Sequence, residues 1–468
     1  MLFSSFEFLF CFLPVVLVLF YTLQRYYPVD KIKLFLFFSS LFFYGWWDLK
    51  YLVIILLSIF LNYSLSFYIR SHSCTKLRKY LTTLGVIFNL IALGYFKYSY
   101  FLAINLNTLF DISIAISKIA LPLGISFFTF QQISFLIDSF QKKVKQDTFL
   151  NYCLFVTFFP QLIAGPIVHH SEMMPQFNKV NLKKLNYKNI QSGLLLFSIG
   201  IFKKIAIADQ LSPYVTSGFN NSVALGFVEA WFTSIAYTIQ IYFDFSGYSD
   251  MALALALFFN IKLPINFNSP YKATNIKEFW DRWHITLSRF LRDYIYIPLG
   301  GNRLGKKKAA FNVFITFLIG GIWHGAGWTF ILWGLLHGLA SLIHRFLPEK
   351  YKLNRYCSWL LTFVFINFTW VFFRAENLTS ASKLISSMIM LYSIDLHSEV
   401  SFLKDKGALT LCLLVIILIS YRVKNSNQIV SSFQPNLKYS ALIIFNSFVS
   451  LYLIFFGGAP TKFLYFDF

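Results

Sequence analysis

The chain predicts an all-α, polytopic membrane protein, and three observations support this fold class. Of the 468 residues, 57% are hydrophobic and only 13% are charged, whereas soluble domains carry about 25% charged residues. Apolar runs recur along the whole chain. The run at residues 309–344 contains no Asp, Glu, Lys or Arg, and it is longer than the roughly 20 residues that one helix needs to cross a bilayer.

Fifteen apolar runs are candidate membrane segments, and several are too short for a full crossing. They lie at residues 5–23, 32–47, 50–69, 80–97, 119–137, 149–168, 190–208, 223–243, 250–261, 309–322, 328–344, 357–373, 384–394, 407–421 and 439–457. We therefore expect about 11 to 13 transmembrane helices, with additional re-entrant and interfacial helices. Because no repeat or linker interrupts the chain, residues 1–468 are expected to form a single membrane domain.

The charge balance indicates membrane topology. The chain has 41 Lys and Arg against 20 Asp and Glu, a net charge of +21. Basic loops at residues 70–79, 141–145, 179–188 and 262–308 are expected on the cytoplasmic side, because Lys and Arg concentrate there in membrane proteins. No nucleic-acid-binding motif accompanies these charges, so we expect no nucleic-acid partner.

The run 309–344 contains the first candidate catalytic residue. Four glycines between residues 320 and 327 surround His324. A broken helix at membrane depth persists only where it is buried in protein or lines a cavity, and an ionisable residue inside a membrane segment indicates a functional site. His324 can accept a proton near neutral pH, so it fits acyl transfer and proton-coupled transport equally well. The structural alternative is a histidine bonded to backbone at a helix break.

The spacing of the candidate ligands predicts no metal site. His337 and His344 follow His324 by 13 and 20 residues, which does not place them on one helix face at adjacent turns. The five Cys residues lie singly. The chain also lacks the glycine-rich phosphate loop, the GxSxG elbow and the HExxH zinc motif.

Residues 275–298 predict an amphipathic helix on the membrane surface. Asn275 followed by Glu278 is an N-cap signature, and Pro298 ends the segment. His284 falls on the edge of the apolar face, at the boundary between water and hydrocarbon. A packing role and a functional role both fit this position.

Several other polar residues interrupt apolar runs. Gln131 and Gln132 are expected to form interhelical hydrogen bonds. His169 and His170 follow a Gly-Pro break and are expected to be solvated at the water boundary.

Asp244 and Asp250 flank the sequence FSGYS between apolar runs. Their spacing of six residues does not place them together as a catalytic carboxylate pair would require. We expect them to cap helices or to have partners in a structural role.

Five stretches carry a family resemblance. They read PLGISFFTFQQISFLID, FFPQLIAGPI, DFSGYSDMALALA, WDRWHITLSRFLRDYIYIPLGGNR and GGIWHGAGWTFILWGLLHG. Together they resemble the bacterial membrane-bound O-acyltransferase (MBOAT) family, in the branch of the alginate O-acetylation protein AlgI and the peptidoglycan O-acetylation proteins. The D-alanyl transfer protein DltB is a more distant relative. The motifs fall within residues 85–345, and the resemblance continues through the C-terminal helices and tail at 346–468.

The resemblance implies a ring of helices around a thin core crossed by a tunnel. The histidine of the motif WHGAGW is His324, and the resemblance implies that it acts as the general base. The second motif histidine is His284, expected to position the donor or relay a proton. Four further residues in or near these motifs are candidate substrate-binding residues: Trp323, Trp283, Asn275 and Arg282.

The resemblance also implies the substrates and partners. The expected acyl donor is cytoplasmic acetyl-CoA, which acts as a substrate and not as a bound cofactor. The acetyl group would cross the bacterial inner membrane for O-acetylation of a cell-envelope or exported polysaccharide. An SGNH-type acetyltransferase outside the membrane is the expected partner, and membrane lipid surrounds the chain.

Two alternatives remain open from the sequence. A DltB-like D-alanyl transferase would take its acyl group from a carrier protein. A transporter or flippase would move its substrate without forming a covalent product.

The aromatic C-terminus, FLYFDF at residues 463–468, follows a Gly/Pro break. Such a tail can lie in the membrane interface as an anchor. AlgI-like chains share this ending, and by that resemblance Tyr465 would accept the acyl group as a phenyl ester and pass it on.

Overall fold

The computed structural model confirms the predicted fold class, because all regular elements in the part of the chain that it describes are helices. It describes residues 1–117, 119–145, 148–178, 185–221, 225–348, 353–389, 396–457, 461, 463 and 464. Their contacts fall into two compact units. Unit 1 comprises Met1–Ser198, Tyr248–Pro264 and Pro435–Phe445, and unit 2 comprises Ile199–Gly247, Ile265–Gln434 and Asn446–Phe468.

Unit 1 contains the N-terminal helices. They are η1 (Glu7–Phe12), α1 (Leu13–Tyr26), α2 (Val29–Gly45), α3 (Leu49–Ser71), α4 (Thr75–Phe110), α5 (Ile125–Phe140), α6 (Phe149–Thr157), α7 (Phe159–Leu162) and α8 (His170–Phe177). The division between the units falls within α9 (Tyr187–Phe202), α11 (Phe227–Phe258) and α20 (Leu437–Phe456).

Unit 2 contains the segments with the candidate histidines. Its helices are η3 (Lys203–Ala208), α10 (Asp209–Asn220), η4 (Pro270–Lys272), α12 (Ile276–Trp280), α13 (Ile285–Leu291), η5 (Arg292–Tyr296), α14 (Gly305–His324), α15 (Trp328–Phe346), α16 (Arg355–Arg374), α17 (Leu378–Met388), α18 (Leu396–Arg422) and α19 (Ser426–Ser431).

Among the described residues, six helical segments are long and apolar enough to cross a membrane. They are Glu7–Tyr26, Leu49–Ser71, Thr75–Phe110, Tyr187–Asn220, Arg355–Arg374 and Leu437–Phe456. Repeated segments of this kind confirm a multi-pass membrane protein. The total of 11 to 13 crossings and the ring with a tunnel stay predictions.

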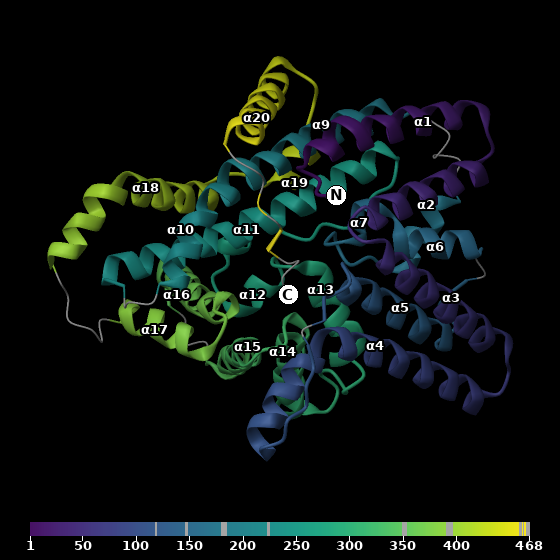
Figure 1. The fold of residues 1–468 in the computed structure, drawn as a ribbon, viewed down its shortest axis with the longest axis horizontal. Helices are drawn as coiled ribbons and strands as arrows, with labels where there is room; N and C mark the ends of the chain where they lie inside the picture. Colours follow the sequence, from purple (N-terminus) through teal and green to yellow (C-terminus); the bar gives the residue numbers. More distant parts are fainter. Residues whose placement is uncertain are drawn as a thin grey trace. The chain divides into compact units, whose positions relative to one another are not determined.

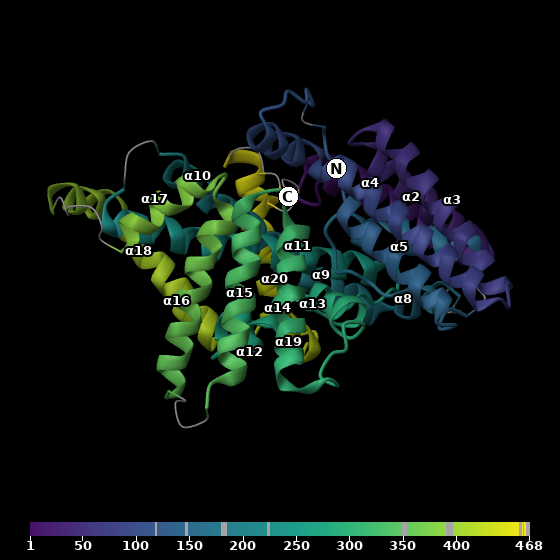
Figure 2. The ribbon, with the colours of Figure 1, turned by 90° about the horizontal axis from the view of Figure 1, so that it is seen from below.

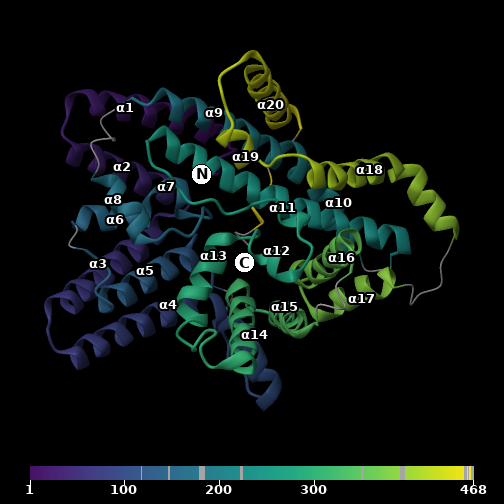
Figure 3. The same cartoon turned by 180° about the vertical axis from the view of Figure 1, so that it is seen from behind.

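Within unit 1, α3, α4 and α5 lie side by side (Figures 1 and 3). Polar side chains join them inside the apolar interface: the hydroxyl of Ser58 donates to the amide oxygen of Gln132 at 3.2 Å, and Asn62 bonds Asn89. Buried amides need such partners because leaving them unpaired costs free energy. The interhelical role predicted for Gln132 is therefore confirmed.

Helix α11 corrects one sequence prediction. The runs 223–243 and 250–261 were expected to be separate segments, yet one helix runs without a break from Phe227 to Phe258. FSGYS does not end it, and at Gly247 a Cβ would lie 2.7 Å from the carbonyl oxygen of Gly200. The glycine permits close approach of two helical backbones instead of a turn.

The predicted surface helix at 275–298 is also corrected. It consists of three pieces, α12, α13 and η5. The break falls at His284, whose φ of 44° and ψ of 53° are left-handed, a conformation that non-glycine residues adopt at a cost. Most of the apolar face is buried inside the protein, and His284 is fully buried with it (0% exposed), so it does not lie at a water boundary.

The run 309–344 forms an antiparallel pair, α14 and α15, with α16 beside α15 (Figure 2). Gly320 and Gly321 do not break α14, which continues to His324. Gly321 instead faces Gly334 of α15, where an added Cβ would lie 2.9 Å from the Gly334 Cα. The true interruption is residues 325–327, so the chain reverses directly after the histidine.

Candidate active site

His324 is the last residue of α14 and is buried, with 3% of its surface exposed. Three aromatic rings surround it, with centroid distances of 4.9 Å to Trp323, 5.0 Å to Trp333 and 5.1 Å to Phe373. Helices α14, α15 and α16 thus each supply one wall. Water is largely excluded there, which strengthens any electrostatic interaction that the imidazole makes.

His284 is held by a hydrogen-bonded turn. Its Nδ1 lies 3.1 Å from the Asn266 side-chain oxygen, which also accepts from the Thr286 backbone N–H and hydroxyl at 3.3 and 2.9 Å. Because this oxygen is an acceptor, Nδ1 carries the proton and Nε2 carries the lone pair. Burial lowers the pKa of His284 to about 3, so the ring is neutral at physiological pH.

A continuous aromatic cluster joins the surroundings of the two histidines. Trp333, against His324, lies 6.0 Å from Trp370, and Trp370 lies 4.9 Å from Trp283, the residue before His284. The indole N–H groups of Trp333 and Trp370 are buried and have no hydrogen-bond partner among the described residues. Such groups are rare in proteins and call for an explanation.

The four candidate substrate-binding residues divide into two pairs. Trp323 and Trp283 are buried and belong to the aromatic cluster. Asn275 accepts a hydrogen bond from the Glu278 backbone N–H at 2.9 Å, so it caps α12 as its sequence pattern predicted. Arg282 pairs with Glu278 at 2.9 Å and donates to the Asn268 carbonyl. These contacts stabilise the α12 segment.

A buried ion cluster holds the start of the C-terminal tail. The Lys204 ammonium lies 2.8 Å from Asp209 and 2.6 Å from Asp244. The Thr461 hydroxyl donates to Asp209, and the Leu464 backbone N–H donates to Asp244 at 2.9 Å. Asp244 therefore has the partnered structural role that was one of its two predicted roles. It does not cap a helix, because it lies inside α11.

This cluster brings the tail beside His284. The buried ring of Phe463 lies 5.5 Å from that of Phe245, which in turn contacts the His284 ring at 4.9 Å. Tyr465 lies outside the described residues, and its predicted role stays a prediction. The segment that precedes it packs against the wall of the candidate site.

A second feature is a cavity of about 620 Å³ formed by α12 to α15. Four cationic side chains line it: Lys277, Arg289, Arg292 and Arg345. Asp281, which pairs with Lys277, several polar side chains and apolar residues such as Trp280 and Phe317 line the rest. The Trp280 ring also lies 5.7 Å from Trp333, so the cavity shares a wall with the cluster around His324.

In unit 1, three side chains that are distant in the sequence form one hydrogen-bonded group. Asp138 at the end of α5 accepts from His169 Nε2 at 2.7 Å and His170 Nε2 at 3.2 Å. His170 is buried, so its predicted solvation is wrong. Within the described ranges this is the one group of three metal-binding residue types with donor atoms within 4.8 Å. The Ser171 N–H donates to His169 Nδ1, which favours an Nε2–H bonded to the carboxylate over a metal ligand.

The apolar helices define a multi-pass membrane protein. The chain belongs to the membrane-bound O-acyltransferase family, whose model matches residues 34–390. It is therefore an acyltransferase, and the transporter alternative does not hold.

Three relatives show where in the family the chain falls. It is 44% identical to a peptidoglycan O-acetyltransferase of Helicobacter pylori, over 100% of this chain and 98% of that protein. It is 40% identical to a probable alginate O-acetylase AlgI of Azotobacter vinelandii, over 83% and 78%. A teichoic acid D-alanyltransferase of Bacillus subtilis is 29% identical over 54% and 69%.

Proposed function

We propose that this protein is an O-acetyltransferase that takes acetyl groups from cytoplasmic acetyl-CoA and passes them across the membrane for O-acetylation of a polysaccharide. One observation carries the proposal: buried His324 shares an aromatic wall with a cavity lined by four cations. Peptidoglycan is the favoured polymer, because the relative named for it matches the whole chain.

The α12–α15 cavity fits the donor. Its volume of about 620 Å³ lies within the roughly 300–1,000 Å³ range of small-molecule sites. Arg and Lys at the cavity supply the donors that phosphate groups require, and the apolar lining suits the pantetheine arm. It lies toward the ends of α14 and α15 that carry Lys306–Lys308 and Arg345, which the positive-inside rule assigns to the cytoplasm.

The chemistry follows from the two histidines. His324 accepts the proton of an acceptor hydroxyl, whose oxygen attacks the thioester carbonyl carbon. The C–S bond then breaks, an acetyl ester forms, and the CoA thiolate takes up a proton. The indole N–H groups of Trp333 and Trp370 are suited to stabilise the oxyanion, because preorganised donors in a dry site have a large effect on rate. His284, held in one tautomer by Asn266, positions the donor or relays the proton.

The tail and an outer partner complete the route. The packing of Phe463 beside His284 supports Tyr465 as a transient acyl carrier, since its neighbours reach the site wall. An SGNH-type acetyltransferase outside the bacterial inner membrane would receive the acetyl group and modify the polymer.

The test is transfer from radiolabelled acetyl-CoA in membranes that contain the full-length protein and its partner. We expect His324→Ala to lower labelling of the polysaccharide by at least about 100-fold, the usual contribution of a general base. His72→Ala is the matched control, because His72 is exposed at the end of α3. Undiminished labelling by His324→Ala would refute the mechanism.

The same assay distinguishes acetyl transfer from D-alanyl transfer, the activity for which the Bacillus relative is named. A carrier protein loaded with an acyl group would then serve as donor, and acetyl-CoA would not.

A further inference from the structure

His337 lies in the middle of α15 and is completely buried (0% exposed). Its Nδ1 accepts a hydrogen bond from the indole N–H of Trp280 at 3.2 Å, and its Nε2 lies 3.1 Å from the hydroxyl oxygen of Thr369. An indole nitrogen can only donate, so Nδ1 carries the lone pair and the Nε2–H donates to Thr369. The Thr369 hydroxyl donates in turn to the Ile366 carbonyl at 2.9 Å. Both imidazole nitrogens are therefore engaged, and the ring is held in one tautomer.

This chain of hydrogen bonds holds the indole of Trp280, the last residue of α12. The Trp280 ring lies 5.2 Å from that of Phe317 and 5.7 Å from that of Trp333. The imidazole of His337 adds an edge contact at 5.2 Å. Because α12 has only five residues and so short a helix is not stable by itself, these contacts with α14 and α15 determine where the indole lies.

Trp280 separates the donor cavity from the aromatic cluster around His324. It lines the cavity formed by α12 to α15, whereas Trp333 and His324 do not. The Trp280 ring contacts Trp333, and the Trp333 ring lies 5.0 Å from His324. An acyl group that extends from the cavity toward His324 therefore meets the Trp280 indole first.

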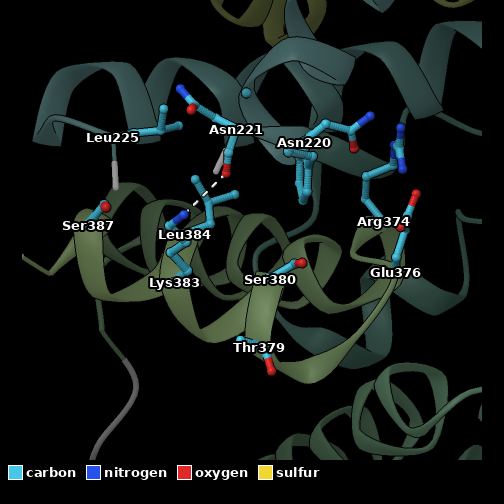
Figure 4. Close-up of a pocket in the computed structure, with 12 residues that line it drawn as sticks. Asn220, Asn221, Leu225, Arg374, Glu376, Thr379, Ser380, Lys383, Leu384 and Ser387 are labelled. Atoms are coloured by element: carbon cyan, nitrogen blue, oxygen red, sulfur yellow. Dashed lines mark hydrogen bonds between the residues drawn. The ribbon is translucent and has the colours of Figure 1, made fainter. Parts of the chain in front are cut away.

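The other side of His324 has a different character. Phe373 packs 5.1 Å from His324, and the next residue, Arg374, lines a separate cavity of about 360 Å³ (Figure 4). That cavity is formed by the end of α10, the end of α16 and α17, and charged and polar side chains line most of it. Neither Trp280 nor His337 is among the described residues that line it. Any restriction that the Trp280 indole imposes therefore acts on the donor side.

We infer that His337 is a positioning residue that selects the acyl group of the donor. By holding the Trp280 indole across the inner end of the donor cavity, it admits an acetyl group and excludes longer acyl chains. The inference rests on the proposed function and adds to it the feature that sets the length of the acyl group.

The physical reason is the close packing around the indole. A longer chain can enter only if the indole moves, and an indole that moves loses its bond to Nδ1 of His337. Leaving a buried N–H without an acceptor is unfavourable, so the hydrogen bond opposes this movement. A rigid apolar wall of this kind distinguishes chains that differ by one methylene by about 10–200-fold.

The first experiment compares two donor analogues that bind without reacting. In acetonyl-CoA and 2-oxopentyl-CoA a methylene group separates the sulfur from the carbonyl carbon, so no acyl group can be transferred. The analogues differ only in the length of the chain beyond the carbonyl. Dissociation constants are measured with the full-length protein in detergent, and we expect acetonyl-CoA to bind at least about tenfold more tightly. Equal affinity, tighter binding of the longer analogue, or no binding of either would overturn the proposal.

Variants test whether the hydrogen bond of His337 sets this preference. His337→Leu removes the acceptor for the Trp280 indole, whereas His337→Asn keeps an oxygen near the position of Nδ1. We expect His337→Leu to lower the ratio of the two dissociation constants by about tenfold, which abolishes the preference, and His337→Asn to retain it. Trp280→Phe, at the other end of the bond, should act as His337→Leu does. His72→Ala, at the exposed end of α3, should leave the ratio unchanged.

Thermal unfolding checks that each variant is folded, and the ratio does not depend on how much of a sample is active. A wild-type ratio in folded His337→Leu and Trp280→Phe would refute the role of His337. The same loss of preference in His337→Asn as in His337→Leu would also refute it, because the shape of the ring and not its hydrogen bond would then be responsible.

Transfer assays with acetyl-CoA and butyryl-CoA separate this inference from the proposed function. If the analogues show the expected preference and its dependence on His337, but the wild type transfers no acetyl group, the function fails and the selection by His337 stands. If acetyl transfer occurs and butyryl-CoA is an equally good donor, the selection fails alone.

Discussion

Asn266 is the residue on which the orientation of His284 depends, since one amide oxygen accepts from the His284 ring and from Thr286. Removing it leaves buried donors without a partner, which costs about 1–3 kcal/mol for each such group. The same bond fixes which imidazole nitrogen carries the lone pair. Asn266 therefore selects the tautomer of His284 and also stabilises the fold.

We predict that Asn266→Ala lowers acetyl transfer by about tenfold or more in protein that remains folded, since a group that fixes the orientation and tautomer of a functional histidine typically contributes about 10–100-fold. Thr286→Val is the matched control, because it removes a donor to Asn266 and leaves the His284 bond in place. Transfer is measured at equal amounts of folded enzyme. If the two variants had equal activity, the bond would have no role beyond stability.

The burial of His284 also predicts a pH dependence of stability. Its pKa is about 3 in the folded protein and about 6.5 in an unfolded chain. Between these values the unfolded state binds the proton and the folded state does not, so stability falls as the pH is lowered from about 6.5 toward 3. This one group accounts for up to about 1.4 kcal/mol per pH unit.

We predict that the melting temperature of the wild type in detergent falls more steeply over this pH window than that of His284→Gln, which has no imidazole to protonate. Parallel curves would show that His284 is not held in the neutral form.

At the scale of elements, the α14–α15 pair sets the position of His324. Gly321 and Gly334 face each other, and a Cβ on Gly321 would lie 2.5 Å from the Phe330 carbonyl oxygen. Backbone cannot move away as a flexible side chain can, so overpacking there costs about 1–3 kcal/mol or separates the helices. His324 is three residues from this contact.

Gly321→Ala should therefore reduce both thermal stability and acetyl transfer. Gly327→Ala serves as the control within the same hairpin, because its added Cβ would meet its nearest neighbour at 3.5 Å, an ordinary contact. Melting temperatures and transfer rates of the two variants are compared side by side. Similar effects of both substitutions would contradict the close packing described for α14 and α15.

The ion cluster at Lys204 is the second element-scale feature. Lys204 keeps Asp209 as its partner when Asp244 is neutralised, so the cost is that of weakening the charged hydrogen bonds that Asp244 accepts, about 1–3 kcal/mol each. Asp244→Asn should therefore destabilise the protein and free the tail, making its C-terminus sensitive to carboxypeptidase. Asp281→Asn, which breaks the exposed pair with Lys277, should change stability by less than about 1 kcal/mol. A tail equally protected in both variants would show that Asp244 does not hold it.

At the scale of the whole molecule, composition and hydropathy were sufficient to predict a polytopic helical membrane protein. Motif residues were sufficient to find His324 and His284 as candidates. These properties are local in the chain: apolar length, glycine placement and residue type. The burial of His284 was missed because a helical wheel assumes an unbroken helix, and the left-handed residue that breaks it is a histidine and not a glycine.

Contacts between segments that are distant in the chain could not be predicted from the sequence. Asp138 is 31 and 32 positions from His169 and His170, and Asp244 meets Leu464 across 220 positions. No periodicity relates such residues, so only the fold reveals that they are partners.

The central claim is that an acetyl group passes from a cytoplasmic thioester to an outer acceptor through His324. The most direct measurement uses sealed vesicles that hold the protein in their membrane. The outer partner and a polysaccharide are on one side of this membrane, and radiolabelled acetyl-CoA is on the other. We expect label on the polysaccharide for the wild type, and at least about 100-fold less for His324→Ala. Equal labelling by both proteins, or labelling only when donor and acceptor share one side, would contradict the account.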